Sequence, residues 1–382
     1  MSVWEKIIGQ SAAVQQLQTA AASGAPTHAW LVSGPPGSGR STVALAFAAA
    51  LLCDQPDPHS RGCGTCKSCT TVLGGTHADL THFTTENSSI KIEEARELVV
   101  KAQDRPSVGR WRVIIVEDAD RMLERTSNVL LKAIEEPPPH TIWILSAPSP
   151  VDVLVTIRSR CRPVKLRVPA LSEVVSLLES EGVSAEIATR VAALSQGNIG
   201  LARRLANSPD ARERREAVVR LPLTLTSISS AMRAAERLIE IADAEAEADA
   251  QARNDVERAQ LMTTLGIEEG EKVNPSMRAQ IRQLEDDQKR RAKRIKTDTL
   301  DRFLVDIQTV LRDVLSIQLG TGAALINVHL AQELQQFVAR VPQEQTIEKL
   351  DAVALTRRRI ATNASARLAF EAMMTSFVVN RA

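Results

Sequence analysis

A glycine-rich segment, Gly34 to Ser41, constrains the fold of this chain more than any other feature. It follows the short apolar run 30–33 and precedes an Ala-rich helical pattern over 42–52. Strand, glycine-rich loop and helix in this order are typical of a phosphate-binding loop, because glycines let successive backbone N–H groups curl around an anion at a helix N-terminus. The sequence therefore predicts an α/β nucleotide-binding-like domain around this segment.

Further apolar runs predict a parallel sheet. They lie at 30–33, 113–116 and 142–145, and each is continuous rather than alternating, which suits strands buried on both faces. Amphipathic stretches lie between them. Strands that alternate with helices indicate a doubly wound α/β domain with helices on both faces of the sheet, up to about residue 168.

Helical patterns replace the strand signal beyond residue 170. Residues 169–208 predict a module of three short helices, and 209–382 predict an all-helical domain. A charged insertion, 242–298, has an acidic run at 243–249 and a basic run at 289–294. We expect a solvent-exposed helical hairpin whose oppositely charged arms pair, and a nucleic-acid-binding arm is the alternative.

The residues expected to surround a nucleotide depart from a working ATPase site. Arg40 stands where the phosphate-loop pattern has lysine, and a planar guanidinium does not freely replace a compact ammonium. A loop kept only for the fold, and a loop that binds ATP and Mg²⁺ weakly without turnover, both remain open. The candidate residues are Gly34, Gly37, Gly39, Arg40, Ser41, Thr42, Glu117 and Asp118.

The two carboxylates are a second departure. In active P-loop ATPases, the strand that corresponds to 113–116 ends in an Asp that joins the Mg²⁺ shell. The Glu that follows orients the attacking water. Here Glu117 precedes Asp118, so each side chain differs by one methylene from the one its position requires. Because a misplacement of about 1 Å can cost about a hundredfold in rate, we expect impaired hydrolysis.

Four cysteines form a compact pattern directly after the loop helix. Cys53, Cys63, Cys66 and Cys69 have the spacing C-x₉-C-x₂-C-x₂-C, which suits a tetrahedral structural Zn²⁺ bound by four thiolates. Free thiols are the alternative. Cys161 lies far from this cluster in sequence and is expected to be a packing residue.

The composition argues against a dedicated nucleic-acid binder. The chain has 47 Lys plus Arg against 46 Asp plus Glu, and only 3% aromatic residues with no Tyr. Tight binding of DNA by this chain alone is therefore not expected. No signal-peptide pattern and no apolar run of about 18–20 residues is present, so we expect a cytoplasmic protein with no membrane partner.

Three segments together resemble the clamp-loader family of AAA+ proteins. Residues 128–138 are similar to the family's Leu-Leu-Lys-x-Leu-Glu-Glu-Pro-Pro helix and turn, and 156–161 carry its Ser-Arg-Cys signature. Residues 8–10 and 28–31 resemble its opening segment. The resemblance implies an AAA+ domain over 1–168 with a zinc module at 53–69, a helical lid at 169–208, and a helical collar for oligomerisation at 209–382.

The resemblance also assigns a role to Arg160. In the family, the arginine of Ser-Arg-Cys is a finger that reaches the γ-phosphate held by a neighbouring subunit, and a structural arginine paired with a carboxylate is the alternative. Two γ-phosphate-sensing positions of the family are lost. The first position aligns with Ala147 or Pro148, shortly after the apolar run 142–145. The second aligns with Gly200 in the helical lid. Arg203 lies one helical turn after Gly200 and is not counted as a replacement for the family's lid arginine.

Loss of the chain's own ATPase residues with retention of the finger implies a stator. Such a subunit does not hydrolyse ATP by itself but belongs to an ATPase complex of the DNA polymerase III holoenzyme. The implied partners are motor subunits of the τ/γ type, a δ subunit, and the β sliding clamp and primed DNA through the complex. The alternatives are an active τ/γ-like motor and a zinc-dependent DNA-binding module.

Overall fold

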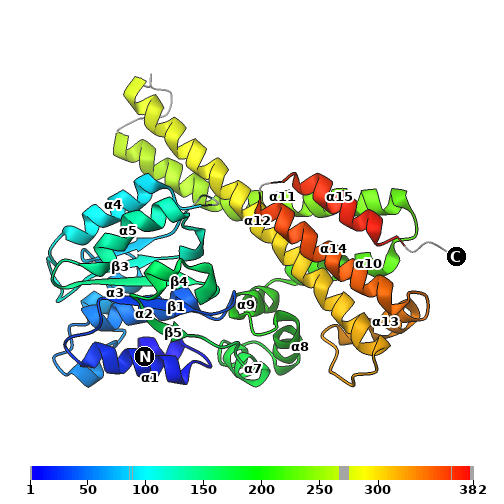
Figure 1. The fold of residues 1–382 in the computed structure, drawn as a ribbon, viewed down its shortest axis with the longest axis horizontal. Helices are drawn as coiled ribbons and strands as arrows, with labels where there is room; N and C mark the ends of the chain where they lie inside the picture. Colours follow the sequence, from blue (N-terminus) through cyan, green and yellow to red (C-terminus); the bar gives the residue numbers. More distant parts are fainter. Residues whose placement is uncertain (1, 86, 88, 266–274, 363, 379–382) are drawn as a thin grey trace. The chain divides into compact units, whose positions relative to one another are not determined.

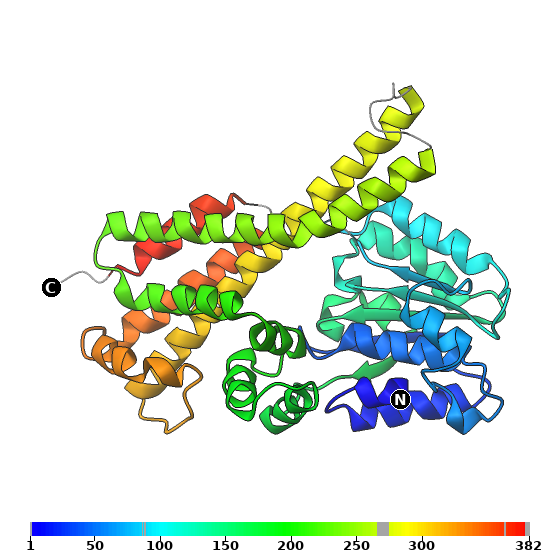
Figure 2. The ribbon, with the colours of Figure 1, turned by 180° about the vertical axis from the view of Figure 1, so that it is seen from behind.

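The computed structural model describes residues 2–85, 87, 89–265, 275–362 and 364–378. The chain divides into two compact units, Met1–Asn207 and Ser208–Ala382 (Figures 1 and 2). Short 3₁₀ helices occur at Val3–Lys6, Pro58–Ser60, Ala119–Arg121, Pro150–Asp152 and Val328–Leu330. Within the described ranges, no helix is both long enough and apolar enough to cross a membrane.

The first unit contains a parallel sheet of five strands in the order β2-β3-β4-β1-β5. The predicted α/β fold is confirmed, and the three predicted runs lie in the central strands β1, β3 and β4, whose residues are all buried. The sequence did not predict the edge strands β2 and β5. The strands are β1 Ala29–Ser33, β2 Leu80–Phe83, β3 Arg112–Val116, β4 Thr141–Ala147 and β5 Arg162–Lys165.

Helices cover both faces of this sheet (Figure 1). Alternate strand residues face opposite layers, so Trp30 and Val32 pack with α2, whereas Leu31 packs with α4 and α5. One layer comprises α1 Ser11–Ala22, α2 Arg40–Leu52 and α3 Lys67–Leu73. The other comprises α4 Ile92–Gln103, α5 Glu124–Glu135 and α6 Val155–Arg158.

Three short helices complete the first unit, as the sequence predicts, and are called the lid helices below; the second unit is helical. The lid helices are α7 Leu171–Ser180, α8 Ala185–Ser195 and α9 Ile199–Asn207. The second unit contains α10 Pro209–Thr224, α11 Ile228–Leu265, α12 Pro275–Gln318, α13 Ala331–Val338, α14 Gln343–Ala361 and α15 Ala366–Ser376.

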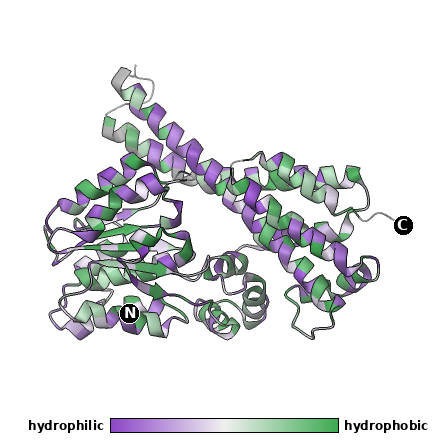
Figure 3. Ribbon diagram, in the orientation of Figure 1, coloured by the Kyte–Doolittle hydropathy of each residue, from purple (hydrophilic) through white to green (hydrophobic). Residues whose placement is uncertain are grey.

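The charged insertion forms parts of the two long helices α11 and α12, which contact each other. Its acidic and basic residues pair between the helices. Lys296 Nζ lies 2.5 Å from Asp243 Oδ1, and Arg291 Nη1 lies 3.0 Å from Glu257 Oε2. Figure 3 shows the hydrophilic character of this part of α12. Residues 266–274, which would connect the predicted hairpin, lie outside the described residues.

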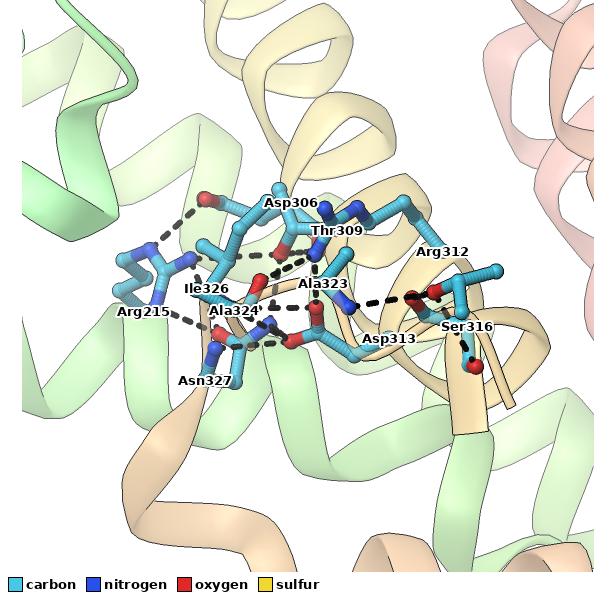
Figure 4. Close-up of polar contacts among 11 residues, drawn as sticks. Arg215, Asp306, Thr309, Arg312, Asp313, Ser316, Ala323, Ala324, Ile326 and Asn327 are labelled. Carbon is cyan, nitrogen blue, oxygen red and sulfur yellow. Dashed lines mark hydrogen bonds and ion pairs between the residues drawn. The ribbon is translucent and has the colours of Figure 1, made fainter. Parts of the chain in front are cut away.

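A buried polar network holds the second unit together (Figure 4). Arg215 on α10 donates to Asp306 on α12 at 2.8 Å and to Asn327 Oδ1 at 3.2 Å. Asp313, with no exposed surface, accepts the backbone N–H of Asn327 at 2.8 Å. Because removal of one partner would leave a buried charge uncompensated, the network fixes the loop that contains Asn327 against α10 and α12.

In the first unit, Asp79 directly precedes β2 and anchors the loop 107–109. Its carboxylate accepts the backbone N–H groups of Ser107 at 2.6 Å, Val108 at 2.8 Å and Gly109 at 2.6 Å. Burial opposes ionisation of this carboxyl, but the hydrogen bonds outweigh it and lower the pKa of Asp79 from 3.8 to about 2.

The lowered pKa of Asp79 predicts a defined pH dependence. The stabilisation is present above the unfolded pKa of 3.8 and is lost as pH falls through about 2, and the shift corresponds to about 2 kcal/mol. Asp79→Asn should therefore lower the unfolding free energy near pH 7 by about that amount and flatten its slope below pH 4. Urea unfolding followed by tryptophan fluorescence measures this, because all four Trp lie within residues 4–143. Asp104→Asn, whose carboxylate is 66% exposed, is the control, and an unchanged slope in Asp79→Asn would refute the assignment.

Candidate nucleotide loop, metal centre and exposed arginine

The glycine-rich loop connects β1 to α2 and keeps the shape of a phosphate-binding loop. Gly37 and Gly39 have φ angles of 81° and 91°, in the left-handed region that favours glycine. The helix α2 begins at Arg40, directly after Gly39. The backbone therefore makes the turn that the sequence predicts, and the side chains decide what the loop can bind.

Arg40 is engaged by its own loop. Its Nη1 donates to the carbonyl oxygen of Gly34, and its Nη2 lies 3.8 Å from Asp118 Oδ1. The other carboxylate oxygen of this residue, Asp118 Oδ2, lies 3.4 Å from Arg121 Nε. The guanidinium thus bridges the first residue of the loop and the second carboxylate, a geometry unlike that of a compact ammonium free to reach a phosphate.

Glu117 extends from the end of β3 and bonds to the hydroxyl next to Arg40. Ser41 Oγ donates to Glu117 Oε2 at 2.6 Å, and His82 Nε2 lies 3.0 Å from Oε1. Burial opposes ionisation, but the contacts with His82 and Ser41 outweigh it and lower the pKa of Glu117. The two residues expected to serve Mg²⁺ therefore bond to each other. Sequence reasoning missed His82 because it lies on the edge strand β2.

The lid contacts the glycine-rich loop through Asn198. A Cβ added to Gly37 would lie 2.1 Å from Asn198 Cγ, so the amide side chain occupies the space beside this glycine. Ile199 N also donates to the carbonyl of Gly37 at 3.2 Å, and Asn198 Oδ1 accepts Leu201 N at 3.0 Å as the cap of α9. This contact holds the start of α9 on the loop, and sequence reasoning missed it.

The sensing positions supply no cation. Of the two candidates for the first position, Ala147 ends β4 and Pro148 follows it, and Gly200 lies in the first turn of α9 without a side chain. Arg203 is bound within the lid, where its Nε donates to both carboxylate oxygens of Glu181 at 3.0 and 3.1 Å. Thr42 follows Ser41 in the first turn of α2. The loop therefore keeps its backbone shape, while Arg40, Glu117 and Arg203 already have partners within the chain.

The four clustered cysteines are brought together after α2. Their sulfur atoms all lie within 4.8 Å of one another, and Cys53 Sγ lies 3.7 Å from that of Cys63 and 3.9 Å from that of Cys66. A tetrahedral metal with metal–sulfur bonds of about 2.3 Å requires sulfur separations of about 3.8 Å, whereas a disulfide requires about 2.05 Å. The four thiols are therefore positioned to hold one metal ion.

Backbone geometry explains why the cysteine cluster forms. Cys66 N donates to Cys63 Sγ at 3.4 Å and Cys69 N to Cys66 Sγ at 3.3 Å, which places successive sulfurs on one side of the turn. Trp4 packs on the same segment, since a Cβ at Gly62 would lie 2.7 Å from Trp4 Nε1. The cluster is thereby joined to α2 and to the N-terminal 3₁₀ helix.

Arg160 follows α6 and is partly exposed. Its Nη2 forms an ion pair with Glu135 Oε1, and its Nη1 donates to the carbonyl of Thr156 at 2.8 Å and to Ser159 Oγ at 3.2 Å. The side chains of Arg160 and Glu135 are each 37% exposed. The neighbouring Cys161 is buried, and burial raises the pKa of its thiol to about 12, as suits a packing residue.

Comparison with known proteins identifies related chains. Residues 9–170 match the family model described as DNA polymerase III, delta subunit. The chain is 34% identical to DNA polymerase III subunit delta' of Escherichia coli over 46% of its own length and 53% of the relative's. The corresponding protein of Pseudomonas aeruginosa is also 34% identical, over 50% and 59% of the two lengths. Subunit tau of Bacillus subtilis is 31% identical, over 42% and 28%. The chain thus spans about half the length of the two delta' relatives.

Proposed function

We propose that this chain is a δ′-type stator of a DNA polymerase III clamp loader, because residues 9–170 match the delta subunit family model and two delta' proteins are 34% identical to it over about half of their lengths. In this role it does not turn over ATP itself. It offers Arg160 to ATP bound by an adjacent τ/γ-type motor subunit in a complex that also contains a δ subunit. The complex loads the β sliding clamp on primed DNA.

One observation carries this proposal: Arg40 and Ser41 of the chain's own loop already contact the two carboxylates that follow β3, while Arg160 is partly exposed just beyond the end of α6. Arg40 contacts Gly34 and Asp118, and Ser41 contacts Glu117. These contacts support an impaired nucleotide site. A guanidinium is always charged and presents a rigid fork of donors, so Arg160 suits phosphate recognition in trans.

The remaining parts have supporting roles in the proposal. The second unit, α10 to α15, would act as the collar that joins neighbouring subunits. The four cysteines would bind Zn²⁺, whose filled tetrahedral shell stabilises the fold and leaves no open position for catalysis. The pairing of Lys296 with Asp243 and of Arg291 with Glu257 favours a structural role for the charged insertion over DNA binding by its basic run.

An active motor is the second candidate, and the retained loop shape and the similarity to subunit tau favour it. It would require Arg40 to act on the β- and γ-phosphates in place of lysine. It would also require Ser41 and Glu117 to exchange their mutual hydrogen bond for Mg²⁺.

The isolated chain separates these two candidates. We expect no ATP hydrolysis by the wild-type chain at saturating MgATP, and none by Arg40→Lys, because the carboxylate order and the sensing positions remain altered. Release of labelled phosphate by the purified proteins measures this. The assembled complex serves as the positive control. Turnover by the wild-type chain that Arg40→Ala abolishes would instead identify a motor.

A further inference from the structure

The side chain proposed to act in trans already has an anionic partner within its own chain. Arg160 Nη2 forms an ion pair with the carboxylate of Glu135. Glu135 is the last residue of α5, and Arg160 lies two residues beyond the end of α6. The two helices contact each other, so the pair lies where their C-terminal ends meet.

The opposite edge of the Arg160 guanidinium is anchored independently of Glu135. Nη1 donates to Thr156 O at 2.8 Å and to Ser159 Oγ at 3.2 Å, both within the same short segment. Only the Nη2 edge therefore needs to exchange partners when an external anion arrives. An exchange of one carboxylate for one phosphate oxygen leaves the anchored edge in place.

The exposure of the pair sets its strength. With both side chains 37% exposed, water screens the attraction, so the ion pair is weak. A γ-phosphate carries more charge than a carboxylate and would be met in an interface that excludes water, where a charge-assisted fork is stronger. The carboxylate is therefore strong enough to orient the arginine and weak enough to be displaced.

We propose that Glu135 is a positioning residue that holds Arg160 in a withdrawn state until the γ-phosphate of a neighbouring subunit displaces it. This inference rests on the proposed function of Arg160. Glu135 then restrains hydrolysis in the complex before the clamp and DNA have brought the interface together. After the γ-phosphate is released, Glu135 recaptures the arginine.

The test uses the reconstituted complex with Glu135→Gln, assayed without clamp or DNA. Loss of the competing charge should raise the basal ATPase rate about three- to fivefold, as expected for an exposed pair of this kind. Glu136→Gln is the matched control. Glu136 is the next residue, carries the same charge and is exposed, whereas the ion pair and hydrogen bonds of Arg160 go to Glu135, Thr156 and Ser159. Glu135→Asp, which keeps the charge on a shorter side chain, should restore most of the restraint.

Two further variants separate this inference from the proposed function. Arg160→Ala alone should lower the ATPase, and adding Glu135→Gln to it should change nothing more, because Glu135 acts only through Arg160. If Arg160→Ala lowers the rate but folded Glu135→Gln matches wild type or falls below it, the role of Glu135 is overturned and the proposed function stands. If Arg160→Ala leaves the rate unchanged, the proposed function itself fails.

Discussion

If Arg160 acts as the proposed finger, replacing it with alanine is expected to lower ATP hydrolysis at the neighbouring motor site by about a thousandfold or more. A finger arginine neutralises charge that develops on the transferred phosphoryl group, and its removal costs about 10³–10⁵ in rate. Because the side chain is partly exposed and lies at a helix end, its truncation should leave the fold intact. Single-turnover phosphate release by the reconstituted complex measures the loss, which affects one site and leaves the others active.

Two matched variants define what Arg160 contributes. Arg160→Lys keeps the positive charge but loses the planar fork, so we expect only partial recovery. Arg158→Ala removes the same charge two residues earlier, where the half-buried guanidinium donates to Pro150 O at 3.2 Å, and should retain hydrolysis. Equal losses in Arg158→Ala and Arg160→Ala would point to a general effect of α6 instead of a finger.

The second large effect concerns the cysteine cluster. Cys66→Ser is expected to remove one thiolate ligand, release the bound metal and destabilise the first unit. Structural Zn²⁺ sites contribute about 10–16 kcal/mol of apparent binding energy in small zinc peptides, which is comparable with the total stability of a domain. Metal content by mass spectrometry should fall from one zinc per chain to none. Thermal unfolding followed by tryptophan fluorescence should shift to lower temperature, since Trp4 packs on Gly62.

A fifth cysteine provides the control for the cluster. Cys161→Ser changes a buried thiol that is not one of the four clustered cysteines, so the zinc content should stay at one per chain. Any loss of stability in this variant measures packing alone. A purified wild-type chain that retains its fold after metal removal by a chelator would contradict the structural role of the metal.

The sequence predicted the central strands but not the edges of the sheet, for a physical reason. Strands β1, β3 and β4 are buried on both faces and are therefore continuous apolar runs. Edge strand β5 has one buried residue among four and contains Pro163, and β2 likewise has a single buried position. Such half-exposed segments carry too weak a hydrophobic pattern to distinguish them from loops.

The residues of the candidate site likewise fall into two groups, those that the sequence could indicate and those that only the structure reveals. Local patterns in sequence pointed to the loop glycines and the four cysteines as candidates, and the resemblance to the clamp-loader family pointed to Arg160, because each motif needs only neighbours along the chain. The partners His82, Asn198 and Glu135 come from other elements and carry no motif for their contacts. Only tertiary structure brings His82 to Glu117, Asn198 to Gly37 and Glu135 to Arg160.

A crossed comparison in the reconstituted complex tests the stator assignment most directly. Arg40→Ala disables the chain's own loop and Arg160→Ala removes the proposed finger, and tryptophan fluorescence checks the fold of both variants. With motor subunits, δ, clamp and primed DNA present, the account predicts that Arg40→Ala retains the ATPase and clamp loading of wild type, while Arg160→Ala loses activity at the adjacent site. Loss of activity in Arg40→Ala with full activity in Arg160→Ala would contradict it and identify this chain as a motor.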